Sequence, residues 1–295
     1  MYISRTIQDK IFKTSHFFPV LLVNGPRQSG KTTVLKHCMQ ATNEPQRNYV
    51  TLDTLENREL AVRDPALFLQ RFPAPLLIDE IQYAPELLPY IKAIVDEKNQ
   101  AGMYWITGSQ QFRLMKNVSE SLAGRIGILN LQGFSQSEKF GCPATPVFLP
   151  DSNYLEQQSA KRPKQDLRTI YEIIWKGSFP KLWTAENEQW KTYYDSLVQT
   201  YLERDIRDLT SISDELIFVK FLKVIAARTG QLINFTEVAK DIGVSQPTVK
   251  SWLSVLQTSG LVYLLQPYYA EVVLKSIKQN TASAATRSGC SRAKP

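Results

Sequence analysis

The stretch Val20-Leu21-Leu22-Val23-Asn24-Gly25-Pro26-Arg27-Gln28-Ser29-Gly30-Lys31-Thr32-Thr33 decides the fold. An apolar run leads into Gly25-x-x-x-x-Gly30-Lys31-Thr32, which is the spacing of a phosphate-binding loop. Glycine lets the backbone approach the phosphates, while loop N–H groups and the positive end of the next helix attract the anion. The predicted nucleotide contacts are Gly25, Pro26, Arg27, Gln28, Ser29, Gly30, Lys31, Thr32 and Thr33.

Two of these side chains have specific expected roles. Lys31 is expected to reach the β- and γ-phosphates, and the Thr32 hydroxyl is expected to bind Mg²⁺. A buried strand at Val20–Val23 and a helix from Lys31 to Gln40 provide the strand-loop-helix context that the motif needs.

Further apolar strands follow the loop and alternate with helices. The expected strands are Tyr49–Asp53, Leu76–Glu80, Met103–Ser109 and Ile126–Leu131, and a helix is expected to begin near Pro85. Short apolar strands that alternate with helices favour an α/β fold, a parallel sheet with helices on both faces.

The second half of the chain has a different character. A length of 295 residues suggests two domains. We expect a nucleotide-binding domain at 1–135, beginning with a helix over 1–16, a linker at 136–165, a mainly helical region at 166–269 and a disordered basic tail at 270–295. From Asn280 onward the tail has no Val, Ile, Leu, Met or aromatic residue, so it cannot bury an apolar core.

Residues 166–269 are expected to hold helices at 166–175, 188–209 and 214–228, followed by a helix-turn-helix. The first helix of that motif is expected to be capped by Thr236, the turn to lie at Gly243 and the second helix to be capped by Ser245. A strand at Leu261–Gln266 would begin a wing, so the sequence predicts a winged helix.

Asp79 and Glu80 end a buried strand and form the second part of the predicted site. Asp79 is expected to hold Mg²⁺ and Glu80 to activate water as a general base. Thr107, Ser109 and Gln110, at the end of another strand, are candidates for sensing the γ-phosphate or orienting water. Arg125 is a candidate arginine finger, acting within its own subunit or on a neighbour's site.

The carboxylate pair also separates reaction classes. Small-molecule kinases of this fold need no water-activating glutamate, and GTP-binding proteins would have a glycine after the metal-binding Asp and an Asn-Lys-x-Asp guanine reader, which this sequence lacks. ATP hydrolysis is therefore favoured over phosphate transfer and over a GTP switch.

Four blocks resemble the prokaryotic AAA-type ATPases that carry a C-terminal domain of unknown function. They are Gly25–Thr33, Leu77–Gln82, Thr107–Ser109 and Leu122–Arg125, and Tyr201–Arg207 resembles the start of the C-terminal part. The resemblance implies an ATPase core, a winged-helix middle and a further nuclease-like domain. The chain departs from this pattern after about Tyr269, which predicts a truncated or frameshifted member.

Three functions remain open at this point. The first is an Mg²⁺-dependent ATPase coupled to the C-terminal region, and the second is an ATP-regulated DNA-binding protein that contacts DNA through Gln246, Thr248 and Lys250. The third is a truncated fragment that only binds nucleotide.

Composition says little about partners. The net charge of +7 is compatible with DNA without requiring it. The three cysteines form no metal-ligand pattern and favour a cytoplasmic protein. The longest apolar run near the start of the chain, Phe17–Val23, contains Pro19 and is too short to span a membrane. A protein partner and an oligomer both remain open.

Overall fold

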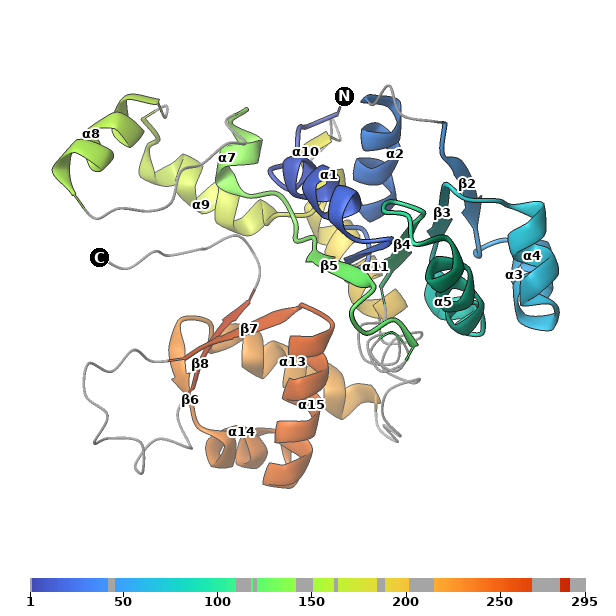
Figure 1. Ribbon diagram of the computed structural model, residues 1–295. Helices are drawn as coiled ribbons and strands as arrows, with labels where there is room; N and C mark the ends of the chain where they lie inside the picture. Colours follow the sequence, from blue (N-terminus) through green and yellow to red (C-terminus); the bar gives the residue numbers. More distant parts are fainter. Residues whose placement is uncertain are drawn as a thin grey trace, which may run out of the picture. The chain divides into compact units, whose positions relative to one another are not determined.

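The computed structural model describes residues 2–41, 46–109, 118, 121–141, 151–161, 164–184, 189–201, 215–266 and 282–286 (Figure 1). The chain divides into two compact units. One comprises Met1–Arg162 together with Phe179–Trp183, and the other comprises Pro163–Ser178 together with Thr184–Pro295.

The first unit is built on a five-stranded sheet in the order β2-β3-β4-β1-β5, in which every neighbouring pair is parallel. Its strands are β1 (Val20–Asn24), β2 (Asn48–Thr51), β3 (Leu76–Asp79), β4 (Tyr104–Gly108) and β5 (Ile126–Asn130). The predicted α/β class with a parallel sheet is confirmed. The second strand ends at Thr51, so Asp53 lies in the turn that follows it.

Helices cover both faces of this sheet, as Figure 1 shows. The longer ones are α1 (Gln8–Phe17), α2 (Lys31–Ala41), α3 (Leu55–Arg63), α4 (Pro65–Arg71) and α5 (Leu87–Lys98). Helix α1 begins at Gln8 and not at residue 1 as expected, and the Gln8 side chain accepts the Arg5 N–H (2.8 Å) and the Ser4 hydroxyl (2.9 Å) of the segment before it. The sequence did not predict α3 and α4.

Two apolar cores result from the alternation of side chains along the strands. Leu22, Ile78 and Ile106 face one core with α4 and α5, whereas Leu21, Leu77 and Trp105 face the other with α1 and α2. Since both faces are buried, the strands are continuous apolar runs. The sheet is thereby a rigid support for the loops at its edges.

The expected linker at 136–165 contains ordered elements of the first unit. They are α7 (Gln136–Lys139) and α8 (Ser152–Lys161). Ser135 and Glu138 form a reciprocal capping box, and Glu138 is 3% exposed. The polar sequence Ser135-Gln136-Ser137-Glu138-Lys139 was therefore misread as a surface connection, because Glu138 is buried by pairing with a distant arginine.

Phe179–Trp183 also belongs to the first unit, and most of it lies in α10 (Pro180–Thr184). A Cβ placed at Gly30 would lie 3.8 Å from Cγ of Pro180. The Lys139 ammonium lies 4.1 Å from the ring centroid of Trp183. A segment from the second half of the chain thus packs beside the phosphate-binding loop.

The second unit is mainly helical. Its elements are α9 (Leu167–Lys176), α11 (Trp190–Tyr201), α13 (Glu215–Ala227), β6 (Gln231–Ile233), α14 (Phe235–Ile242), α15 (Gln246–Thr258), β7 (Val262–Leu265) and β8 (Ala282–Thr286). The strands form an antiparallel sheet in the order β6-β8-β7. Phe218, Phe221 and Trp252 form the aromatic centre of its core, with ring centroids 5.1–5.6 Å apart.

The turn between α14 and α15 follows the prediction at Gly243, which has φ +79°, and at the Ser245 cap, whose hydroxyl accepts the Thr248 N–H. The cap of α14 differs. Asn234, rather than Thr236, accepts the first N–H groups of that helix with its side chain. Asparagine and threonine both suit this position, so local sequence could not separate two candidates only two residues apart.

Five residues of the expected tail form β8. This strand pairs antiparallel with β6 and β7. The rest of 270–295 lies outside the described residues.

Candidate functional site

The phosphate-binding loop connects β1 to α2 at the carboxyl edge of the sheet. Gly25 has φ +153°, and a Cβ there would lie 2.0 Å from the carbonyl oxygen of Leu131. Gly30 has φ +89°. Glycine is therefore required at position 25 by a backbone contact, and it suits the left-handed conformation at position 30.

Lys31 and Ser29 are buried within this loop. The Lys31 ammonium donates to the carbonyl oxygens of Gly25 (3.1 Å) and Pro26 (3.0 Å). The Ser29 hydroxyl is fully buried and has no hydrogen-bond partner among the described residues. Buried hydroxyls normally have a partner, so the loop holds a polar group that a bound phosphate would satisfy.

Asp79 is the centre of a hydrogen-bond network at the same edge. Its Oδ1 accepts the hydroxyls of Thr32 (2.6 Å) and Thr107 (2.5 Å), and its Oδ2 accepts the Tyr49 hydroxyl (3.4 Å). Burial, then the charge of Asp79, raises the pKa of Tyr49, so this phenol stays protonated as a donor. A hydroxyl and a buried carboxylate in contact are suitable oxygen ligands for Mg²⁺.

Glu80 lies beside Asp79 in a left-handed conformation with φ +60°. Its backbone N–H donates to Thr107 Oγ1 (3.0 Å), and its Oε2 accepts the Ser109 hydroxyl (3.1 Å) and the Gln82 amide. The predicted residues Thr107 and Ser109 therefore contact the carboxylates Asp79 and Glu80. Gln110 lies outside the described residues.

Gln82 was not among the predicted site residues, yet it lies beside Glu80. Its Nε2 also contacts Ser109 Oγ (3.3 Å), and its Oε1 is buried without a partner among the described residues. The sequence could have indicated Gln82, since it is a polar residue two positions after Glu80. A side chain just beyond the end of β3 lies close to the carboxylates at that strand end.

Arg125 lies at the amino-terminal ends of the strands, opposite the ends from which the phosphate-binding loop leaves the sheet. The Val20 N–H at the start of β1 donates to the Arg125 carbonyl (3.2 Å), whereas the phosphate-binding loop leaves the end of β1. A strand of five residues spans about 17 Å at roughly 3.3 Å per residue. The structure therefore does not bring Arg125 to the loop of its own unit.

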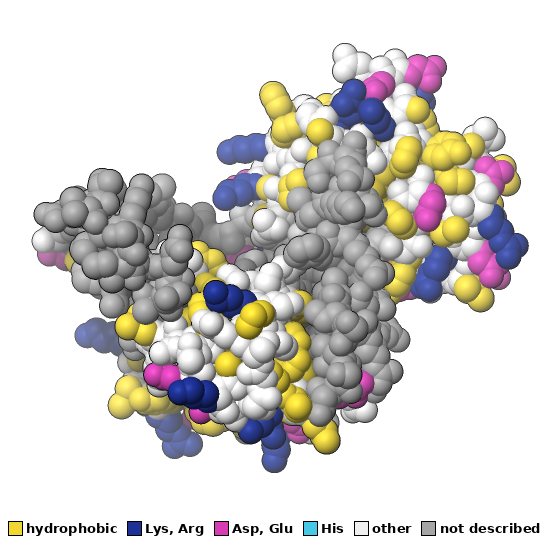
Figure 2. Space-filling view, turned by 90° about the horizontal axis from the view of Figure 1, so that it is seen from below, with side chains coloured by type: hydrophobic (Ala, Val, Ile, Leu, Met, Phe, Trp, Pro, Cys, Tyr) yellow, Lys and Arg dark blue, Asp and Glu magenta, His cyan; other side chains and the backbone are white. Residues whose placement is uncertain are grey.

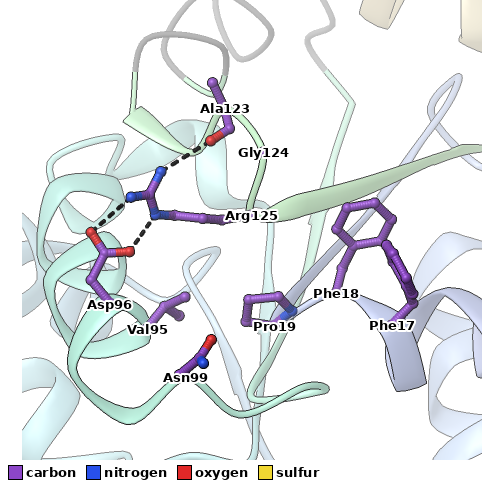
Figure 3. A pocket seen from close by; sticks show the side chains of 9 residues that line it. All are labelled: Phe17, Phe18, Pro19, Val95, Asp96, Asn99, Ala123, Gly124 and Arg125. Atoms are coloured by element: carbon purple, nitrogen blue, oxygen red, sulfur yellow. Dashed lines mark hydrogen bonds and ion pairs between the residues drawn. The ribbon is translucent and has the colours of Figure 1, made fainter.

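The surroundings of Arg125 form a hollow of about 590 Å³, lined by Phe17, Phe18, Pro19, Val95, Asp96, Asn99, Ala123, Gly124 and Arg125 (Figure 3). Figure 3 shows the guanidinium turned toward Asp96 and the Ala123 carbonyl, and Nη2 lies 3.0 Å from Asp96 Oδ2. Hydrogen bonds from Arg125 lower the pKa of Asp96.

The candidate DNA contacts lie at the start of α15 in the second unit. Gln246 and Lys250 are exposed, whereas Thr248 is half-buried, and its hydroxyl lies 2.7 Å from that of Ser245. Thr248 thus takes part in the cap of its own helix. Of Tyr201–Arg207, only Tyr201 is described, as the last residue of α11.

Two negative findings apply to the part of the chain that the structure describes. No helix in those ranges combines the length and apolar character needed to cross a bilayer. The same ranges contain no group of three or more His, Cys, Asp and Glu side chains arranged to hold a metal ion.

Two family models match separate parts of the chain. Residues 18–140 match the model of an AAA domain, and residues 167–283 match a domain of unknown function, DUF8612. The second description specifies neither a winged helix nor a nuclease-like domain, so both stay predictions.

Two curated relatives and one solved structure are similar over most of the chain. Uncharacterized proteins of Mycobacterium bovis and Mycobacterium tuberculosis are each 27% identical over 264 residues, which cover 89% of this chain and 53% of theirs. This chain thus spans about half the length of the curated relatives it matches. A Walker-type ATPase of Pyrococcus abyssi has a TM-score of 0.56 at 14% identity, covering 97% of this chain and 94% of that one. The first unit has the P-loop NTPase fold, and residues 18–140 within it are similar to an AAA domain.

Proposed function

We propose that the chain is an Mg²⁺-dependent ATPase whose nucleotide site is the carboxyl edge of the first unit's sheet. The observation that carries this proposal is the contact of Thr32 with Asp79 beside the phosphate-binding loop. That contact joins the two side chains that a magnesium ion would need, one from the loop helix and one from β3. The AAA-domain match over residues 18–140 supports the same assignment.

In this proposal each predicted residue has a distinct task. The backbone of Gly25–Thr33 surrounds the phosphates, with Lys31 exchanging its loop carbonyls for phosphate oxygens. Thr32 and Asp79 hold Mg²⁺, which neutralises charge on the phosphates when it is bound. Glu80 accepts the proton of the attacking water, and Thr107 and Ser109 orient the carboxylates Asp79 and Glu80.

The place of Arg125 in this reaction follows from its edge of the sheet. Since it lies far from the loop of its own unit, we assign it no role in that site and propose that it acts on the site of a neighbouring copy. Arg125 would have to leave Asp96 to do so. This proposal requires an oligomer.

We also propose that nucleotide binding is coupled to the second unit through α10. Pro180 and Trp183 pack near Gly30 and Lys139 within the first unit, and the chain continues from them directly into the second. If the phosphate-binding loop shifts on hydrolysis, α10 would be the first segment to move with it.

DNA binding by the second unit is the alternative function. The order of α13, β6, α14, α15 and β7 supports a winged helix, and the start of α15 exposes Gln246 and Lys250. Against it, Lys250 is the only basic residue of α15. In the face shown in Figure 2, the Lys and Arg side chains of the described residues are scattered among apolar and acidic ones.

The test is steady-state ATP hydrolysis with Mg²⁺ by the full chain and by Glu80→Gln, with ATP binding measured in parallel. We expect turnover to fall by a factor of about 100 or more in the variant while ATP binding persists. Equal turnover in both proteins would refute the role of Glu80. Binding without any turnover would favour a nucleotide-binding fragment.

Duplex DNA provides the second arm of this experiment. Salt-dependent binding that is lost in Lys250→Ala would favour the DNA-binding alternative, because phosphate contacts are weakened by salt. No binding at low salt would exclude it.

A further inference from the structure

Arg5 is a buried arginine beside the phosphate-binding loop. It is 5% exposed, and its guanidinium donates to acceptors on three separate segments. Nη1 donates to the carbonyl of Ser29 (2.9 Å), Nη2 to those of Gln132 (2.6 Å) and Gly133 (3.3 Å), and Nε to Glu138 Oε1 (3.2 Å). Arginine is almost never fully buried unless it is paired.

Glu138 supplies the charge that makes this burial tolerable. Besides Arg5, its Oε1 accepts the backbone N–H (2.8 Å) and the hydroxyl (2.7 Å) of Thr6, and its Oε2 accepts the Ser135 N–H (2.8 Å). A buried ion pair is stable only when its remaining hydrogen-bonding positions are satisfied. This pair therefore links the N-terminal segment, the phosphate-binding loop and α7.

The bond to Ser29 sets the direction of one loop peptide. In a trans peptide the C=O of one residue and the N–H of the next point to opposite sides of the same plane. The Ser29–Gly30 peptide is trans, so a carbonyl held by Arg5 turns the Gly30 N–H away from Arg5. That N–H donates to no backbone carbonyl of the described residues outside the helices and strands.

From this geometry we propose that Arg5, held by Glu138, is a positioning residue that aims the Gly30 N–H at a phosphate of the bound nucleotide. The charged donor on the Ser29 carbonyl also polarises the peptide, which strengthens the N–H as a donor on its other side. The inference rests on the proposed nucleotide site and adds a residue to it from outside the phosphate-binding motif.

A purely structural role is the competing explanation, and Arg47 provides the matched control for it. Arg47 also donates to two backbone carbonyls, those of Gly102 (2.7 Å) and Met103 (3.3 Å), and stacks 4.2 Å from the Trp105 ring centroid. Arg47 directly precedes β2, and its guanidinium lies near the start of β4, at the ends of the strands opposite the phosphate-binding loop. Loss of the two carbonyl hydrogen bonds of Arg47 should lower the stability of the protein without affecting the phosphate-binding loop.

The experiment compares the full chain with Arg5→Lys and Arg47→Lys. Lysine keeps the charge but lacks the planar fork that reaches several carbonyls at once. The first readout is amide hydrogen exchange of the loop without nucleotide, and the second is the affinity for ATP and for ADP. We expect faster loop exchange and an affinity loss of about tenfold for both nucleotides in Arg5→Lys alone, since the loop amides surround the phosphates that ATP and ADP share.

The two readouts distinguish the possible failures. Unchanged loop exchange and unchanged affinity in a folded Arg5→Lys would overturn the inference, as would equal losses in Arg47→Lys. Faster loop exchange in Arg5→Lys, in a chain whose unaltered form binds no nucleotide, would instead overturn the proposed function and confine Arg5 to holding the loop.

Discussion

Replacing Gly25 by alanine tests the backbone contact between the phosphate-binding loop and β5. The added Cβ would lie 2.0 Å from the Leu131 carbonyl oxygen and 3.1 Å from its carbonyl carbon, where ordinary contact begins at 3.4 Å. Neither atom belongs to a flexible side chain. The loop and the end of β5 must therefore move apart.

The cost has three sources. A non-glycine residue with positive φ is strained by about 1–2 kcal/mol, and forcing an atom into a packed site costs about 1–3 kcal/mol. Separation also weakens the bond from the Leu131 N–H to the Asn24 carbonyl (2.7 Å), which contributes about 1 kcal/mol. We expect Gly25→Ala to lower the free energy of unfolding by about 3–6 kcal/mol.

Gly124 is the matched control. It has φ +76° in the same unit, but a Cβ there would meet nothing within 4 Å. Gly124→Ala should cost only the strain of about 1–2 kcal/mol. The assay is urea denaturation followed by circular dichroism. If both variants lose the same stability, the contact with Leu131 does not constrain the loop and the argument fails.

Three further predictions concern other parts of the chain. Burial raises the pKa of Glu138, but Arg5, Thr6 and backbone N–H groups outweigh burial and hold it below 4.5. The stability from Glu138 is therefore complete above pH 4.5 and is lost as the pH falls below it, so in acid titrations Glu138→Gln should lose less stability than the unaltered chain. Asn234→Ala should cost about 1 kcal/mol in thermal or urea unfolding, whereas Thr236→Ala should cost much less. Mixing Arg125→Ala with Glu80→Gln should restore ATP hydrolysis that neither variant has alone, and a mixture without activity would count against action between copies.

Local patterns were sufficient for much of the first unit. The strands around the loop were predictable because a sheet buried on both faces needs uninterrupted apolar runs, and the loop itself because phosphate binding restricts the residues at each position. Asp79 and Glu80 were predictable as candidates since parallel strands bring their carboxyl ends to one edge, as the contact between Thr32 and Asp79 illustrates.

Burial of charge was not predictable from local sequence. Arg5 and Glu138 are separated by 133 positions, and each lies in a stretch that is typical of an exposed surface. The capping-box spacing of Ser135 and Glu138 was a usable signal for α7. It could not reveal that the same carboxylate binds the N-terminal segment.

The sequence by itself determined the class of fold and the phosphate-binding loop, and it predicted the residues that a magnesium nucleotide would need, because these depend on short-range spacing and on the alternation of strands and helices. Only the tertiary structure decided which groups lie at which edge of the sheet. It placed Arg125 at the edge opposite the loop, and it brought Arg5 and Pro180 to that loop from distant parts of the chain. Contacts of this kind depend on how the chain returns on itself, and no local pattern carries that information.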